Sequence, residues 1–219
     1  TDLSDTPNPI DNINGVCPAL KDPFKLPNSF YLKGKDNGYV SIPYNDNLYW
    51  NTDTYTLECF IYLLDTPVSK KLTDEVPLLV GNMVSNSDVN DWSFGPNKNF
   101  GLTFYYNNGS ENYINTEINI LKTHTWYHIA FTYNGINQIK LWIDGNEVKS
   151  STVSGTPQNN NTTFVIGNYN SNYFKGYISN LRITNLVLYA SKFTPVTSNL
   201  TATFDTQLLT FVNSMADLS

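Results

Sequence analysis

Apolar and polar residues alternate along short stretches of this chain from residue 29 onward, as they do in strands that bury one face. A clear example is the run Tyr-Ile-Ser-Asn-Leu-Arg-Ile-Thr at residues 177–184, which follows Gly176. No segment carries apolar residues at helical spacing for a dozen positions. The pattern therefore predicts strands at 29–33, 39–42, 55–64, 77–83, 91–95, 100–106, 113–117, 126–133, 138–143, 146–149, 163–166, 174–184 and 207–211.

Turn sequences separate these predicted strands. Asn-Asn-Gly at 107–109, Asn-Gly at 134–135 and the tract 155–161 each favour a reversal of the chain. Asp144-Gly145 is the most specific signal, because the two residues between flanking strands readily take the φ > 0 turn of a hairpin. Many short strands with frequent turns predict a sandwich or barrel, and no composition break after residue 29 favours a single domain.

The two ends of the chain carry no such pattern. Residues 1–28 hold five prolines without a sustained period, which predicts an extended leader or linker, and residues 213–219 form a short tail. Before the tail, several apolar residues crowd the stretch that precedes Pro195, namely Leu186, Val187, Leu188, Tyr189 and Phe193. This crowding suggests a compact turn clamped onto a larger structure.

The charge of the chain limits the classes of partner that it can bind. The formal net charge is −6, only 15% of residues are charged, and Arg182 is the single arginine. A negative chain without a basic cluster is a poor ligand for nucleic acid or for an anionic membrane. No apolar run approaches the ~20 residues that span a bilayer, so membrane insertion is not expected. Asparagine supplies 31 residues, which either AT-rich coding or a sugar-contacting surface would explain.

Two cysteines are too few for a disulfide framework. Cys59 lies in an alternating run, where a buried thiol acts as a small apolar residue. Cys17 lies in the proline-rich leader, and whether the two are bridged stays open at this stage.

Three stretches together resemble concanavalin A-like, laminin-G-like domains over residues 29–212. The first comprises 29–34, 38–43 and 55–62, and the second is the Trp-x-His-apolar-Ala strand at 126–130 with the hairpin that ends in Asp144-Gly145. The third comprises 165–167 and 174–183. The resemblance implies an all-β, two-sheet antiparallel jelly-roll sandwich. The Leu188-Tyr189 and Phe193-Thr194-Pro195 tail is most similar to domains of phage tails, large-virus virions and bacterial surface proteins, which implies an extracellular or virion-surface location.

The same fold hosts glycoside hydrolases, whose catalytic strand carries Glu-x-Asp-x-x-Glu. Here only Glu58 and Asp144 lie in the relevant strands, and neither has a second acid at i+2 or i+4. We therefore expect no enzyme, with Glu58 as a solvent-facing or capping residue. We expect His128 to be a structural histidine bonded across the sheet. Three tryptophans are assigned to core or strand packing: Trp50, Trp126 and Trp142.

Sugar binding combines an aromatic face with amide or carboxylate groups that bind hydroxyls. Three loops offer that mix, and their candidate ligand-binding residues are Trp92, Tyr106, Asn108, Tyr169, Asn170, Asn172 and Tyr173. The competing interpretation is that the aromatic residues pack the core and the asparagines make turns. Relatives also hold Ca²⁺ at the sandwich rim, so Asp88 and Asp91 are candidate ligands; no other cofactor is expected.

Two functions are compatible with these residues. The first is a non-catalytic module of a larger virion, tail or cell-surface protein that binds host or matrix carbohydrate, or a surface protein, through rim loops. The second is a structural module that cements an assembly, holding neighbouring subunits with the leader and the sheet faces. A glycosidase is a remote third.

Overall fold

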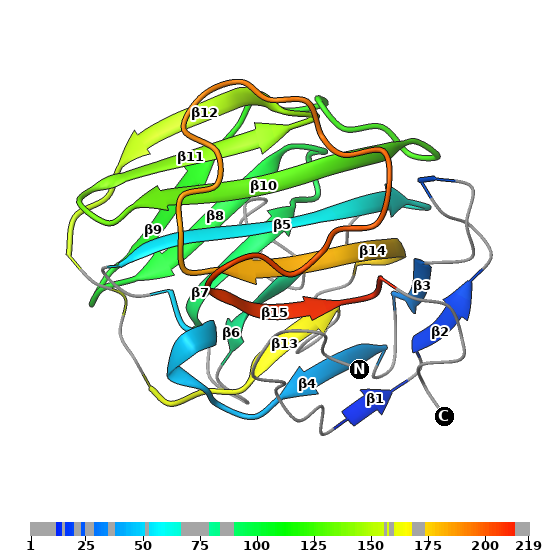
Figure 1. Ribbon diagram of the computed structural model, residues 1–219, viewed down its shortest axis with the longest axis horizontal. Coiled ribbons are helices and arrows are strands. Elements are labelled where there is room, and N and C mark those ends of the chain that lie inside the picture. Colours follow the sequence, from blue (N-terminus) through cyan, green and yellow to red (C-terminus); the bar gives the residue numbers. More distant parts are fainter. Residues whose placement is uncertain are drawn as a thin grey trace.

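The computed structural model describes residues 12–14, 16–19, 23–24, 29–34, 38–50, 53–66, 79–83, 90–155, 157, 160–167 and 174–212. Within these residues the chain is all-β except for one short 3-10 turn, η1 (Asp46–Leu48). The predicted sandwich of two antiparallel sheets is confirmed (Figure 1).

Sheet A is seven-stranded in the part of the chain that the structure describes. Its order is β1 (Asn12–Asn14), β4 (Tyr39–Ile42), β13 (Phe164–Gly167), β6 (Val80–Met83), β7 (Asn90–Pro96), β8 (Leu102–Asn107) and β9 (Glu111–Asn115).

Sheet B is eight-stranded over the same described residues. Its order is β12 (Asn146–Thr152), β11 (Gln138–Ile143), β10 (Trp126–Asn134), β5 (Thr54–Leu63), β14 (Lys175–Thr184), β3 (Ser29–Lys33) and β2 (Val16–Ala19). The short β15 (Thr206–Thr210) pairs with the second half of β14, beyond the part that β3 covers.

The core lies between the two sheets, and the alternation along each strand fills it. On β5 the inward residues are Tyr55, Leu57, Cys59, Ile61 and Leu63, all in the buried cluster. Cys59 is a free, buried thiol, so it does not form a bridge with Cys17. The residues of β5 that alternate with these inward residues face outward. The outer face of sheet B is therefore a second surface, which another part of the chain or a ligand can cover.

Part of the predicted leader belongs to the sandwich. Strand β1 pairs with β4 at the edge of sheet A, and β2 pairs with β3 at the edge of sheet B. Residues 12–14 and 16–19, predicted as part of an extended leader, therefore pair with strands of the two sheets. These residues supply hydrogen bonds to two otherwise open sheet edges. The local sequence does not predict this pairing, since it has a proline at position 18. Residues 1–11 and the predicted tail, 213–219, lie outside the described residues.

A long connection between β14 and β15, residues 185–205, crosses the outer face of sheet B (Figure 1). We call it the strap. The Thr56 hydroxyl donates to the Leu186 carbonyl at 2.5 Å and accepts from the Leu188 amide at 3.0 Å. Farther along, the Phe193 amide donates to the Gly145 carbonyl at 3.0 Å. The compact turn expected before Pro195 is thus tied to strand β5 and to the hairpin turn between residues 143 and 146.

The alternation predicted along β14 is interrupted once. The core positions Ile178 and Leu181 are three residues apart, and the register against β5 shifts between Ser179 and Arg182. Asn180 takes the extra position with a φ of 53°, a left-handed conformation that asparagine tolerates. Its side-chain oxygen accepts from the Leu200 amide at 2.7 Å, so this bulge also fixes the strap.

Candidate functional site

A buried carboxylate lies at the centre of the outer face of sheet B. Glu58 is 1% exposed, although its position on β5 faces away from the core. Its Oε1 accepts from Nε of Arg182 at 2.8 Å and also from Nη2 of the same side chain. Its Oε2 accepts from the Tyr189 hydroxyl at 2.7 Å and lies 2.9 Å from Nε2 of His128. The strap residue Tyr189 closes this network from above.

The prediction that Glu58 is solvent-facing is therefore wrong, because the strap covers the face to which it points. The prediction for His128 is confirmed, since its Nε2 bonds across the sheet to Glu58. Burial raises the pKa of Glu58. The hydrogen bond and charge of His128, the charge of Arg182 and the hydrogen bond from Tyr189 outweigh burial and hold that pKa below its usual value. The ionised carboxylate is thus a structural anchor for the strap.

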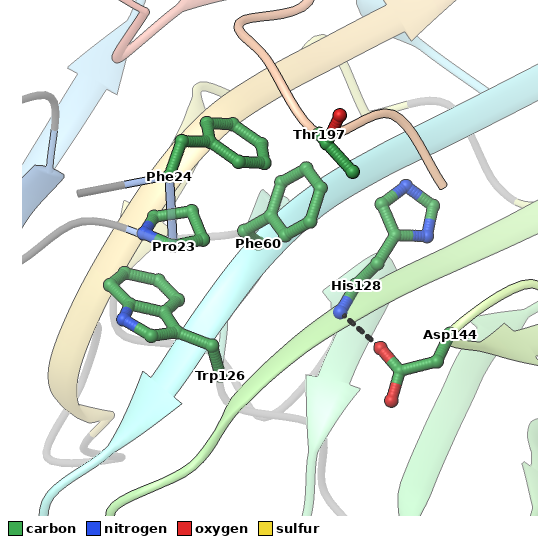
Figure 2. A pocket seen from close by; sticks show the side chains of 7 residues that line it. All are labelled: Pro23, Phe24, Phe60, Trp126, His128, Asp144 and Thr197. Atoms are coloured by element: carbon green, nitrogen blue, oxygen red, sulfur yellow. Dashed lines mark hydrogen bonds between the residues drawn. The ribbon is translucent and has the colours of Figure 1, made fainter. Parts of the chain in front are cut away.

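Beside this network the outer face holds a pocket of about 310 Å³ (Figure 2). Phe60 and Trp126 come from β5 and β10, and the short turn Pro23-Phe24 adds a further wall. Figure 2 shows these rings along one side and Thr197, His128 and Asp144 along the other. The Phe24 and Phe60 rings meet edge to face at 4.9 Å between centroids, and Phe60 contacts the His128 ring at 5.0 Å.

The polar side of the pocket keeps hydrogen-bonding capacity. Asp144 is exposed, and one of its carboxylate oxygens accepts from the His128 amide at 2.9 Å. Its other oxygen bonds no described residue. Thr197 is an exposed residue of the strap. Nδ1 of His128 is buried without a hydrogen-bond partner among the described residues. Aromatic walls facing a carboxylate and a hydroxyl suit a ligand with an apolar face and polar edges.

Two predicted binding residues are in the core. Trp92 is fully buried, with its ring 5.7 Å from Phe131, and Tyr106 is 4% exposed. They cannot meet a ligand at the rim, because both point between the sheets and pack against aromatic rings. The competing interpretation, that such aromatics build the core, is the correct one for them. For Trp126 the outcome is the opposite. It was assigned to core or strand packing, but its side chain is partly exposed on the outer face and lines the pocket.

Asn108 remains a candidate at the rim. Its Nδ2 donates to the Ser154 carbonyl at 2.7 Å, and its Oδ1 accepts from Asn112 at 3.0 Å. The other four predicted ligand-binding residues lie outside the described residues: Tyr169, Asn170, Asn172 and Tyr173.

The calcium prediction is not tested. Asp88 lies outside the described residues, and for Asp91 only the backbone, in β7, is described. Within the described part of the chain, no three His, Cys, Asp or Glu side chains form a group that could hold a metal ion.

A prediction that places binding groups in loops does not include the residues of this pocket. Phe60 is two residues from Glu58 on β5, and Trp126 is two residues from His128 on β10. Each pair shares one face of its strand, so the alternation places both rings on the outer face beside polar groups. That phase was readable from sequence; the approach of Pro23, Phe24 and Thr197 was not.

The chain belongs to the concanavalin A-like lectin/glucanases superfamily, since the laminin-G-type profile of that superfamily matches residues 33–192. A comparison with curated proteins found no match. Membership agrees with the resemblance drawn from the strand motifs. The described residues include no helix with the length and apolar character needed to cross a membrane.

Several solved structures share the fold. The binding domain of botulinum neurotoxin DC, in complex with rat synaptotagmin II, has a TM-score of 0.58 at 17% identity, covering 85% of this chain and 48% of that chain. Botulinum neurotoxin type C, described as entering cells through interaction with two ganglioside molecules, has a TM-score of 0.57 at 17% identity, with coverages of 85% and 47%.

The binding domain of Paraclostridial Mosquitocidal Protein 1 has a TM-score of 0.56 at 16% identity, with coverages of 83% and 45%. This chain spans less than half the length of each of these three chains. At such identities the likeness establishes the fold alone.

Proposed function

We propose that this chain is a non-catalytic recognition module of a larger surface, tail or virion protein, and that it binds carbohydrate in the pocket beside the strap. The observation that carries the proposal is the composition of that pocket. The partly exposed Trp126 offers a ring for the C–H face of a pyranose beside the buried Phe60, while the exposed Asp144 and Thr197 offer groups for its hydroxyls. The volume of about 310 Å³ is at the lower end for ligand pockets, which suits a single sugar unit.

A catalytic role for Glu58 is not part of the proposal. Retaining glycosidases need two carboxyl groups about 5 Å apart with access to substrate. Glu58 is fully buried, and both of its oxygens are occupied by Arg182, His128 and Tyr189. A carboxylate so held can neither attack a sugar nor donate a proton to one.

Two further observations support recognition of a surface ligand. The neurotoxin structures of this fold are described in complex with rat synaptotagmin II or as depending on interaction with two ganglioside molecules. The alternative, a cementing module that uses the leader to hold neighbouring subunits, loses some support because residues 12–14 and 16–19 pair within their own chain. The proposal includes an extracellular or virion-surface location and a calcium ion held by Asp88 and Asp91.

The test is a glycan-array screen of the whole chain in multivalent display, with and without a calcium chelator. Saturable binding is expected, and Trp126→Ala should weaken it roughly tenfold because the ring forms the stacking wall. Thr197→Val, which removes one hydroxyl with little change in shape, should weaken it less. Tyr113→Ala is the matched control, since this partly exposed aromatic lies on β9 of the other sheet. A blank array with folded protein, or equal binding by Trp126→Ala, would contradict the proposal.

A further inference from the structure

Four aromatic side chains cross the outer face of sheet B in one row. Tyr31 on β3 is directly opposite Tyr177 on β14, Tyr177 is opposite Tyr62 on β5, and Tyr62 is opposite Trp126 on β10. The centroids of successive rings are 5.4, 5.8 and 5.5 Å apart. We call these four residues the aromatic row. It lies where β5 ends and β10 and β14 begin.

The row is a surface feature and not a part of the core. Its members are absent from the buried cluster between the sheets. Tyr62 is 5% exposed, and its ring contacts those of Trp126, Tyr177 and His124. Tyr31, Tyr177 and Trp126 are each partly exposed. Neighbouring strands thus present three rings to solvent beyond the area that the strap covers.

The row itself is uncharged. None of its four side chains is charged, and three carry a hydroxyl. Two lysines lie beside one end of the row: Lys175 on β14 is paired with Asp65 at 3.3 Å, and Lys33 on β3, directly opposite Lys175, is exposed. The row is also only one residue wide, whereas a stable protein interface buries about 800 Å² per partner. A narrow, neutral, hydroxyl-bearing aromatic strip favours a neutral polyhydroxy chain.

The row continues into the pocket, because Trp126 belongs to both. The exposed rings of Trp126, Tyr177 and Tyr31 follow one another at centroid distances of 6.5 and 5.4 Å, so they extend over at most about 12 Å, comparable with an extended trisaccharide. Resting on the proposed function, we infer that the ligand is an extended neutral oligosaccharide. One terminal or internal sugar occupies the pocket, and the following units lie across Trp126, Tyr177 and Tyr31.

The test is calorimetric titration of the whole chain with β-linked glucose, galactose and N-acetylglucosamine oligosaccharides, graded from monosaccharide to hexasaccharide. Affinity should rise with length up to about four units, one for the pocket and one for each of the three exposed rings of the row, and then level off. Tyr177→Ala should weaken hexasaccharide binding roughly tenfold and monosaccharide binding far less. Tyr177→Phe should restore most of the loss, because stacking needs the ring. Tyr113→Ala should change neither affinity.

The outcomes separate the two proposals. Binding that does not depend on length, or that Tyr177→Ala and Tyr31→Ala leave unchanged, would overturn the extended site while leaving the pocket as a lectin site. Loss on Tyr177→Ala that Tyr177→Phe does not restore would overturn stacking on the row. Folded protein that binds none of the oligosaccharides would overturn the proposed function and, with it, this inference.

Discussion

Arg182, the single arginine of the chain, is used under the strap. Its guanidinium reaches Glu58 and also donates to the Thr201 carbonyl at 2.8 Å through Nη1. Since a buried ion pair costs desolvation, its main effect is to define one arrangement: removing either partner leaves an uncompensated buried charge. The pair fixes where the strap lies and therefore where Thr197 meets the pocket.

We expect Glu58→Gln to lower the free energy of unfolding at neutral pH by about 3–5 kcal/mol, because Arg182 then keeps a buried charge without its counter-ion. The measurement is urea denaturation followed by tryptophan fluorescence. Glu147→Gln is the control, because Glu147 is a surface carboxyl paired with Lys140 at 2.9 Å and should cost less than about 1 kcal/mol. Equal effects of the two substitutions would contradict the anchoring role.

The pH dependence of this difference has a definite sign. The pKa of Glu58 is lower in the folded protein than in the unfolded chain, so its contribution is fully present above the unfolded value of about 4.3. It is lost as the pH falls through the folded pKa. The stability difference between the native chain and Glu58→Gln should therefore be constant near neutral pH and shrink below about pH 4. A difference that grows in acid would show that the native carboxyl is protonated when folded.

At the scale of elements, the hairpin between β11 and β12 serves two purposes. Gly145 has a φ of 75°, as the Asp-Gly turn predicts. The strap adds a second demand, because a Cβ on Gly145 would lie 1.8 Å from the Phe193 carbonyl oxygen. Phe193 stacks on Tyr189 and contacts the Trp142 ring at 5.6 Å. The turn is therefore the seat of the strap as well as the link between two strands.

Gly145→Ala should destabilise the chain by about 2–4 kcal/mol, the sum of an unfavourable φ and a displaced strap. Gly109→Ala is the matched control: its φ is also positive, at 102°, but a Cβ there would meet nothing within 4 Å. It should cost only about 1 kcal/mol. Thermal unfolding of both variants measures the difference. Similar losses of stability would mean that the strap moves aside without a cost in free energy.

The predicted strands compare well with the observed ones where alternation is strong. Residues 29–33, 39–42 and 138–143 coincide with β3, β4 and β11. The predicted 146–149 falls short of β12, which runs on to Thr152 with mostly exposed side chains and little apolar signal. Strands β1 and β2 were missed because they are short and owe their extended form to pairing with β4 and β3.

For the whole molecule, the leader strands complete both sheets at one side. Removing residues 1–19 should lower the melting temperature by several degrees and expose β3 and β4 as open edges, which favours self-association. Calorimetry and light scattering of the shortened and full chains measure the two effects. A chain lacking only residues 1–11 is the control, since it keeps β1 and β2. An unchanged, monomeric shortened chain would show that these strands add nothing to the fold.

The sequence by itself determined the fold class and most strands, because a strand that buries one face has apolar residues at every second position. It also determined the structural role of His128 and the positive φ of the Asp-Gly turn. It could not decide which outward residues stay exposed, because that depends on a strap more than a hundred residues from β5. Only the tertiary structure buries Glu58, places Trp92 inside and Trp126 outside, and brings Phe24 and Thr197 to one pocket.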